Sequence, residues 1–122
     1  IPIYGKGEQV RDWLYVEDHV NALYKVLMEG RLGETYNIGA NNERTNIEVI
    51  ELVCSILDKK IPLDKGSYKD LIIFIKDRPG HDFRYAIDSS KVKKELNWTP
   101  SESFESGLDK TIEWFIQNKA WL

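Results

Sequence analysis

The fold is decided by the stretch Val10-Arg11-Asp12-Trp13-Leu14-Tyr15-Val16-Glu17-Asp18-His19. Its first part, residues 10–16, mixes aromatic and β-branched side chains, which is typical of a short strand. Apolar residues then recur at helical spacing, at Val16, Val20, Leu23 and Leu27. Gly30 suits the C-terminal end of this helix. A strand that passes directly into a helix indicates an α/β fold.

A second helix has a clear start signal. Thr45 and Glu48 are spaced as in a capping box, in which the two residues close the first helical turn reciprocally. The sequence therefore predicts a helix with Thr45 at its N-cap. Cys54, the only cysteine, is expected as a small core residue on the apolar face of this helix.

The rest of the chain supplies further short strands and helices. Residues 35–39 are predicted as a short strand, and residues 71–75 as an all-apolar strand of the buried kind. Residues 77–82 are predicted as a loop, because Pro79 and Gly80 fit neither a helix nor a central strand. Further helices are expected from about residue 88 to Asn97 and from about Ser103. The strands are too few for a complete doubly wound sheet.

Length and charge narrow the functional class. The 122 residues suit one domain, and a net charge of −3 argues against a general nucleic-acid binder. No apolar run approaches the roughly 18 residues of a membrane span, and no signal peptide is visible. We therefore expect a cytoplasmic protein without a membrane partner. The chain begins with Ile1 and not Met, so residues 1–122 are expected to be a fragment of a longer protein.

Motifs for catalysis and cofactor binding are missing. The pair Gly5 and Gly7 lacks the third glycine, the preceding strand and the following helix of a dinucleotide-binding loop. No tyrosine is followed four residues later by lysine, the pair used by short-chain dehydrogenases. Two histidines and one cysteine, far apart in sequence, do not have the spacing of zinc ligands. We predict no catalytic residue, no metal and no cofactor site in this chain.

Three loops nevertheless carry residues that suit an anion. Arg11 follows the glycine turn, and Arg78 and His81 lie in the loop with Pro79 and Gly80. Asn46 opens the second helix, where free backbone N–H groups and the helix dipole favour negative charge. Arginine can hold two phosphate oxygens at once, so this set would suit a diphosphate.

Simpler interpretations of these residues stay open. Arg11 precedes Asp12, and Arg78 follows Asp77, so each arginine could form only a surface ion pair. His81 could be solvent-facing or structural, and Asn46 could serve only as a favourable residue of the first turn.

Several segments, taken together and in order, resemble the dTDP-glucose 4,6-dehydratases, a family of extended short-chain dehydrogenases/reductases (NAD-dependent epimerases/dehydratases). The resemblance covers essentially the whole chain. Phe83 and Asn97 depart from the family pattern, although asparagine tolerates the left-handed conformation expected at position 97. The matching segments are Pro2-Ile3-Tyr4-Gly5-x-Gly7, Val10 to His19, Thr35-Tyr36-Asn37-Ile38-Gly39, Asp77-Arg78-Pro79-Gly80-His81-Asp82, Arg84-Tyr85-Ala86-Ile87-Asp88, Leu96-Asn97-Trp98-x-Pro100 and Ser103-Phe104-Glu105-x-Gly107-Leu108.

The resemblance implies a C-terminal, substrate-binding lobe whose Rossmann lobe is absent. The missing N-terminal lobe would hold NAD, the catalytic residues and most of the homodimer contact. The parent enzyme would convert dTDP-glucose to dTDP-4-dehydro-6-deoxy-glucose and water, in deoxysugar or rhamnose biosynthesis. Carried over by motif, Arg11, Asn46, Arg78 and His81 would contact the diphosphate and ribose. The pocket for the base would be lined by Pro2, Ile3 and Tyr4.

Two alternatives compete with this interpretation. The chain could be the same lobe of another NAD-dependent nucleotide-sugar epimerase or dehydratase that uses a UDP- or GDP-sugar. It could also be a free-standing nucleotide-binding module. On every one of these hypotheses the fragment alone is expected to be inactive.

Overall fold

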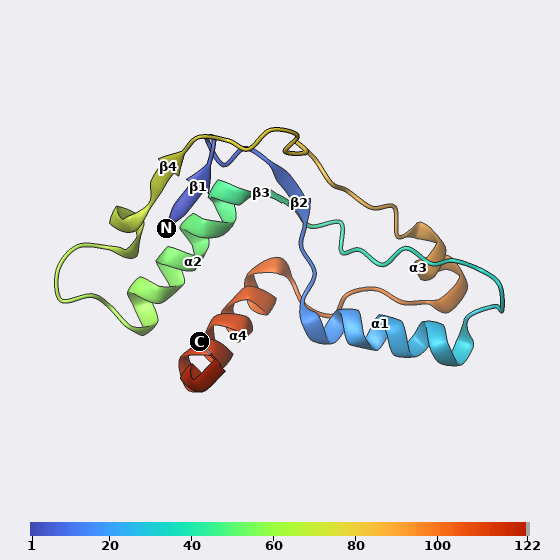
Figure 1. Cartoon of the computed structure of the whole chain (residues 1–122). Coiled ribbons are helices and arrows are strands. Elements are labelled where there is room, and N and C mark those ends of the chain that lie inside the picture. Colours follow the sequence, from blue (N-terminus) through green and yellow to red (C-terminus); the bar gives the residue numbers. More distant parts are fainter. Residues whose placement is uncertain (122) are drawn as a thin grey trace.

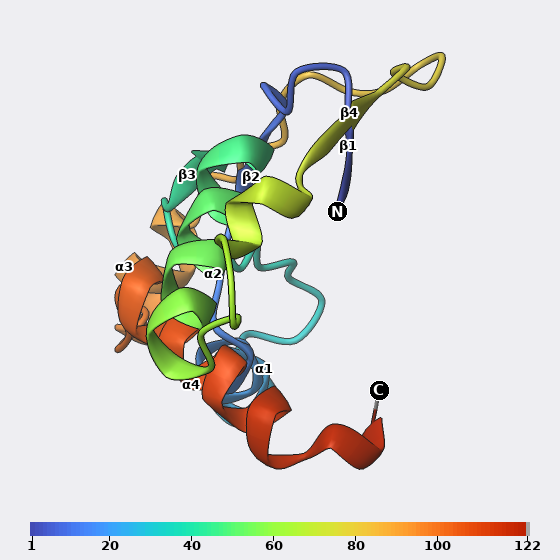
Figure 2. The ribbon, with the colours of Figure 1, turned by 90° about the vertical axis from the view of Figure 1, so that its left-hand side faces the viewer.

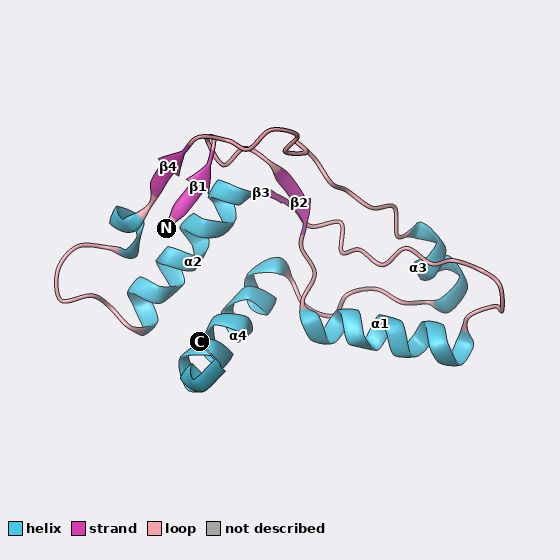
Figure 3. Ribbon diagram, in the orientation of Figure 1, coloured by secondary structure: helices cyan, strands magenta, loops and turns pink. Residues whose placement is uncertain are grey.

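A computed structural model describes residues 1–121 of the chain. Figures 1 and 3 show an open arch in which long loops connect short strands and helices. The strands are β1 (Pro2–Tyr4), β2 (Val10–Asp12), β3 (Glu43–Thr45) and β4 (Ile73–Ile75). The helices are α1 (Val16–Glu29), α2 (Asn46–Lys60), α3 (Ser90–Leu96) and α4 (Phe104–Gln117), with the 3₁₀ turns η1 (Tyr68–Leu71) and η2 (Lys119–Trp121).

The strands form two separate two-stranded sheets. Strand β1 runs parallel to β4, with Ile3 opposite Phe74, and β2 runs antiparallel to β3, with Arg11 opposite Arg44. The α/β class and the shortage of strands are thus confirmed. No helix within residues 1–121 is both long and apolar enough to span a membrane.

The strand predicted for residues 35–39 is wrong for this chain. This segment is extended but makes no backbone ladder with any described residue, and a ladder is what defines a strand. Side chains hold it instead: Lys91 Nζ donates to the carbonyl of Thr35 at 2.8 Å, and Asn37 Nδ2 reaches the carbonyl of Asp88 at 3.5 Å. Its backbone edges are left for water or for another chain segment.

Two further strand predictions need correction. Strand β2 ends at Asp12 and not at Val16, because Tyr15 already serves as the N-cap of α1. Strand β4 begins at Ile73 and not at residue 71, because Leu71 belongs to η1. The strand is exposed along its length, and Phe74 retains 59% of its accessible surface. A sheet of only two strands has no helix over this face, which is why the predicted burial on both faces fails.

Helix α1 matches its predicted span but packs by an unexpected face. The residues that repeat at helical spacing, Val16, Val20, Leu23 and Leu27, are all more than half exposed. The buried residues of α1 are Asp18 and Ala22, and Ala22 joins a small core with Val92, Leu96 and Trp98. The apolar stripe read from the sequence therefore faces away from the core that this chain builds.

The buried Asp18 joins the start of α1 to the segment that precedes α4. Its carboxylate accepts hydrogen bonds from the backbone N–H and hydroxyl of Ser101, at 3.0 and 2.6 Å, and from the N–H of Glu102 at 3.0 Å. Burial alone would raise the pKa of Asp18, but these hydrogen bonds outweigh it and hold the pKa below its ordinary value.

Helix α2 begins as the sequence predicts. The Thr45 hydroxyl accepts from the Glu48 N–H at 3.3 Å, and the Glu48 carboxylate accepts from the Thr45 N–H at 2.7 Å. Cys54 is fully buried, also as predicted. Helix α2 packs against η1 and α4, an arrangement visible in Figures 1 and 2. Asn97 ends α3 with φ of 50°, the expected left-handed conformation.

Helix α4 begins after Ser103, as expected, and approaches the β2–α1 connection at Gly107. A Cβ atom at Gly107 would lie 2.9 Å from the Cβ of Tyr15, so only glycine allows this approach. One turn earlier, Phe104 packs edge-on against Trp13 with 6.4 Å between ring centroids. This contact fixes α4 against the chain that leaves β2.

We expect Gly107→Ala to destabilise the protein by about 1–2 kcal/mol, because the added methyl group overlaps Tyr15. Helix propensity alone predicts the opposite sign, a gain of about 1 kcal/mol for alanine over glycine. Urea unfolding followed by circular dichroism measures the difference. A variant more stable than the unchanged chain would contradict the close packing of α4 on Tyr15.

Asp18→Asn should lower the free energy of unfolding by about 1–3 kcal/mol near neutral pH, since hydrogen bonds to a charged acceptor are lost. The folded pKa of Asp18 is depressed, so its contribution is present above the unfolded pKa of about 4 and is lost as the pH falls through the folded pKa. The stability difference between the two proteins should therefore shrink below about pH 4.

Chemical denaturation at a series of pH values provides this measurement. Asp64→Asn, at an exposed position in the α2–η1 loop, is the matched control and should change little. A stability difference at Asp18 that stays constant down to pH 2 would contradict the hydrogen-bonded carboxylate.

Candidate functional site

The segment Gly5 to Arg11 lies where several parts of the chain meet. Gly5 and Gly7 have φ of 58° and 73°, so they make a left-handed turn after β1 that side chains would oppose. The carbonyls of Gly7 and Gln9 accept from the N–H groups of Ile47 and Asn46, at 2.9 and 3.0 Å. This turn therefore joins β1 to the first turn of α2.

The same segment also contacts the loop that follows β4. Val10 donates to the carbonyl of Phe83 at 2.8 Å and accepts from the N–H of Tyr85 at 3.0 Å. The loops that the sequence singled out are thus brought to one place. Tyr4, Arg11, Asn46, Arg78 and His81 all lie on this segment or on the elements bonded to it.

Arg11 is held by uncharged groups, so its positive charge is not neutralised by a carboxylate within residues 1–121. Its guanidinium donates to the carbonyls of Val10 and Asp82, at 2.7 and 3.0 Å, and lies 4.9 Å from the ring centroid of Tyr85. The alternative of an ion pair with Asp12 is wrong, because adjacent residues of a strand point to opposite faces. Asp12 instead accepts from three successive backbone N–H groups, those of Ala40, Asn41 and Asn42.

Arg78 is also free of its neighbouring aspartate. The Asp77 carboxylate accepts from the backbone N–H of Arg78 at 2.8 Å and does not bind its guanidinium. The Arg78 side chain is exposed, and its guanidinium has no hydrogen bond or ion pair within residues 1–121. Two cationic side chains, Arg11 and Arg78, are thus available to an anion near the same turn.

His81 is anchored and nearly buried. Its Nδ1 lies 2.7 Å from Oδ1 of Asp77, and its ring meets the edge of Tyr4 with 6.0 Å between centroids. The hydrogen bond from His81, aided by the N–H of Arg78 and the amide of Gln9, lowers the pKa of Asp77 against a smaller effect of burial. The interpretation of His81 as a simply solvent-facing residue is therefore wrong, since its side chain retains only 7% exposure.

The prediction of free N–H groups at the start of α2 is wrong. The N–H groups of Asn46 and Ile47 bind the Gln9 and Gly7 carbonyls, and the N–H of Glu48 binds the Thr45 hydroxyl. The capping box and the glycine turn occupy the donors that an anion would have used. The role of the Asn46 side chain stays a prediction.

The three residues expected around the base do not share one face of β1. Ile3 is buried, and its side chain packs against Gly7, whereas Pro2 and Tyr4 are exposed on the opposite face. This alternation follows from the period of two in a strand. Pro2 and Tyr4 can line an open pocket with their side chains, while Ile3 could contribute only through its backbone.

Sequence reasoning missed three residues of this region. Gln9 is buried and donates from Nε2 to Oδ2 of Asp77 at 2.8 Å, and Tyr85 stacks under Arg11. A single glutamine has no pattern that could reveal such a contact. Asp77 stood inside the recognised loop motif but was considered only as a partner of Arg78.

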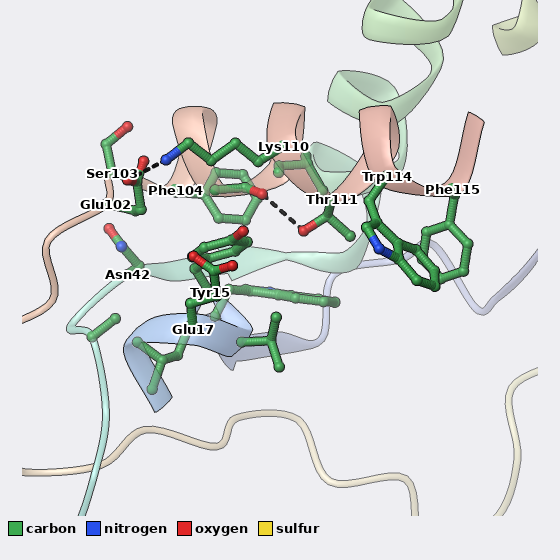
Figure 4. A pocket seen from close by; sticks show the side chains of 16 residues that line it. Tyr15, Glu17, Asn42, Glu102, Ser103, Phe104, Lys110, Thr111, Trp114 and Phe115 are labelled. Carbon is green, nitrogen blue, oxygen red and sulfur yellow. Dashed lines mark hydrogen bonds and ion pairs between the residues drawn. The ribbon is translucent and has the colours of Figure 1, made fainter. Parts of the chain in front are cut away.

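Two hollows lie beside β2. A small one of about 200 Å³ is lined by Arg11, Tyr85 and the 38–39 and 86–87 segments. A larger apolar groove of about 560 Å³ lies between α4 and the β2–α1 connection, and Figure 4 shows Tyr15, Phe104, Lys110 and Trp114 around it. None of the predicted site residues lines the larger groove. Within residues 1–121, no cluster of three acidic, histidine or cysteine side chains could hold a metal ion.

Comparisons with known proteins agree with the motifs. Residues 1–111 match the family described as GDP-mannose 4,6 dehydratase. A dTDP-glucose 4,6-dehydratase of Escherichia coli is 57% identical over 122 residues, which are 100% of this chain and 34% of that protein. The chain thus spans about a third of the length of the curated relatives it matches.

Solved structures give the same picture. A dTDP-glucose 4,6-dehydratase from Bacillus anthracis in complex with NAD superposes with a TM-score of 0.85 at 47% identity, over 98% of this chain and 35% of that one. A UDP-glucose 4-epimerase from Thermotoga maritima with UDP-glucose gives 0.80 at 31% identity, over 98% and 35%. The chain therefore belongs to the family described as GDP-mannose 4,6 dehydratase, and it matches the C-terminal region of extended short-chain dehydrogenase/reductase dehydratases.

Proposed function

We propose that this chain, residues 1–122 in its own numbering, is the nucleotide-sugar-binding part of a longer enzyme, an NAD-dependent dTDP-glucose 4,6-dehydratase. The observation that carries the proposal is the pair Arg11 and Arg78, two guanidiniums beside one glycine turn that form no ion pair with a carboxylate of residues 1–121. Each can bind phosphate oxygens in a bidentate manner, as a diphosphate requires.

The choice of dTDP-glucose rests on the relatives. Identity is 57% and 47% to two dTDP-glucose 4,6-dehydratases but 31% to a UDP-glucose 4-epimerase, over nearly the same residues. A UDP- or GDP-sugar substrate is the weaker alternative. On this proposal, Pro2 and Tyr4 line the side of the pocket for the base, and Asn46 and His81 contact the diphosphate and ribose.

The binding role can serve a reaction that occurs on another part of the enzyme. The whole enzyme would convert dTDP-glucose to dTDP-4-dehydro-6-deoxy-glucose and water. A firm hold on the unreactive diphosphate uses remote binding energy to orient the sugar for that reaction. Residues of this chain would bind and orient, and the groups that move protons would lie elsewhere in the enzyme.

NAD does not fit the glycine turn of this chain. The expectation that no strand precedes Gly5 and Gly7 is wrong, because β1 ends at Tyr4. The expected absence of a following helix holds: the turn leads into β2, whereas a dinucleotide-binding loop leads from a strand into the N-terminus of a helix. We therefore assign NAD to the remaining part of the parent enzyme, as we do the catalytic residues. A cytoplasmic location, expected from the sequence, and a homodimeric parent, implied by the family resemblance, stay predictions.

We expect the chain to bind dTDP more tightly than UDP or GDP, and Arg78→Ala to weaken dTDP binding by about tenfold or more. The reason is the loss of hydrogen bonds between a charged donor and a charged acceptor, worth about 1.5–3 kcal/mol. Isothermal titration calorimetry at moderate salt measures both quantities. Lys94→Ala, at an exposed position on α3, removes a positive charge outside the site and is the control.

An unchanged dissociation constant for Arg78→Ala would remove Arg78 from the site. A folded chain that binds none of the three nucleotides would contradict a binding site preformed in these residues.

The purified chain with added NAD and dTDP-glucose should form no dehydrated product. No tyrosine of the sequence is followed four residues later by lysine, and the glycine turn does not suit a dinucleotide. Chromatography of the nucleotide sugars after long incubation checks this. Product that accumulates in proportion to the amount of chain would overturn the assignment of catalysis to another part of the enzyme.

A further inference from the structure

Three donors converge on the carboxylate of Asp77, which lies just after β4. Oδ1 accepts from the backbone N–H of Arg78 at 2.8 Å and lies 2.7 Å from Nδ1 of His81, while Oδ2 accepts from Nε2 of Gln9 at 2.8 Å. These contacts favour the ionised carboxyl and lower its pKa, with the His81 hydrogen bond as the largest cause. An ionised carboxylate can only accept, so Nδ1 of His81 must carry a proton.

The position of the His81 ring leaves one ring nitrogen for a ligand. The side chain is only 7% exposed, and the edge contact with Tyr4 restricts its rotation. Nε2 has no hydrogen-bond partner within residues 1–121, whereas Nδ1 is occupied by Asp77. With Nδ1 protonated, Nε2 of a neutral ring is a hydrogen-bond acceptor.

The hydrogen-bonding groups of a nucleotide sugar match different side chains of this site. The diphosphate at neutral pH offers only acceptors, which suit the guanidinium donors of Arg11 and Arg78. A hydroxyl of the ribose or of the hexose offers a donor, which suits the lone pair on Nε2 of His81. A ring with its only proton on Nδ1 is therefore matched to a hydroxyl and not to a phosphate oxygen.

Gln9 fixes the acid that orients this ring. Gln9 is 6% exposed, and its amide must turn Nε2 toward Asp77, because its oxygen would be repelled by the carboxylate. The backbone carbonyl of Gln9 also accepts from the N–H of Asn46. Through Gln9, the Asp77 carboxylate is thus connected to the first turn of α2, where Asn46 is another residue predicted to contact the ligand.

We propose that Asp77 is a positioning residue, which holds His81 with its proton on Nδ1 and presents Nε2 as an acceptor to a hydroxyl of the bound nucleotide sugar. This inference rests on the proposed function. It assigns to His81 the hydroxyl contact and leaves the phosphates to the two arginines.

The tautomer of His81 can be observed by long-range ¹H–¹⁵N NMR of the imidazole rings. The chain has two histidines, and the exposed His19 serves as an internal reference. The spectra are recorded at about pH 8.5, two units above the ordinary histidine pKa. We expect the Nδ1–H tautomer for His81 in the unchanged chain. The variant Asp77→Ala, which leaves no side-chain acceptor for Nδ1–H, should lose that tautomer.

The matched control is Asp88→Ala, which removes one negative charge at the start of α3 and should leave the His81 signals unchanged. A His81 ring protonated on Nε2 in the unchanged chain would overturn the proposal, and this spectrum decides the tautomer even where a variant fails to fold. An Asp77→Ala spectrum identical to that of the unchanged chain would overturn it as well.

Calorimetry with dTDP separates this inference from the proposed function. We expect Asp77→Ala to weaken binding by about tenfold and Asp88→Ala to leave it unchanged. Unchanged affinity in Asp77→Ala, with the tautomer lost, would overturn the role of Asp77 and leave the proposed function in place. A folded, unchanged chain that binds no dTDP would overturn the proposed function, and with it the ligand contact of Nε2.

Discussion

Residues 7–10 form backbone hydrogen bonds on two sides. On one side the carbonyls of Gly7 and Gln9 accept from the first two N–H groups of α2, and on the other Val10 exchanges two bonds with the loop after β4. Segments about forty and seventy-five residues further along the chain are thereby held against one short stretch. Neither small sheet could place the candidate ligand residues without this double pairing, since each sheet has only two strands.

Asp12 and Asp77 bind backbone N–H groups and do not pair with Arg11 and Arg78. Asp12 fixes the 40–42 segment, and Asp77 fixes the loop that contains Arg78 and His81. Both acids are adjacent in sequence to an arginine, yet neither pairs with it. A chain with a net charge of −3 can in this way keep local positive charge for an anionic ligand.

Features that depend on neighbouring residues could be predicted from the sequence, and features that depend on distant ones could not. The capping box at Thr45, the left-handed Asn97 and the span of α1 follow from local chemistry, and all three are confirmed. The strand at residues 35–39 failed because a strand needs a ladder partner that no local pattern supplies. The apolar stripe of α1 was recognised, but periodicity shows only that one face is apolar and not which element covers it.

The candidate site shows the same division. Motif resemblance selected Arg11, Arg78 and His81, which the fold brings to one turn, but the expected free N–H groups of α2 were already bonded by Gly7 and Gln9. Gln9 and Tyr85 could not be found, because their importance comes from contacts across about seventy residues of sequence. The alternation of Ile3 with Pro2 and Tyr4 was readable in principle from the period of a strand.

The reactivity of the buried Cys54 can be used to detect the opening of helix α2. Burial, assisted by the charge of Asp58, raises the pKa of its thiol, so the reactive thiolate is both scarce and shielded in the folded chain. An alkylating reagent can reach this sulfur only when α2 opens. Because α2 also carries Asn46 on its first turn, the rate of alkylation measures how often the helix behind the candidate site separates from its neighbours.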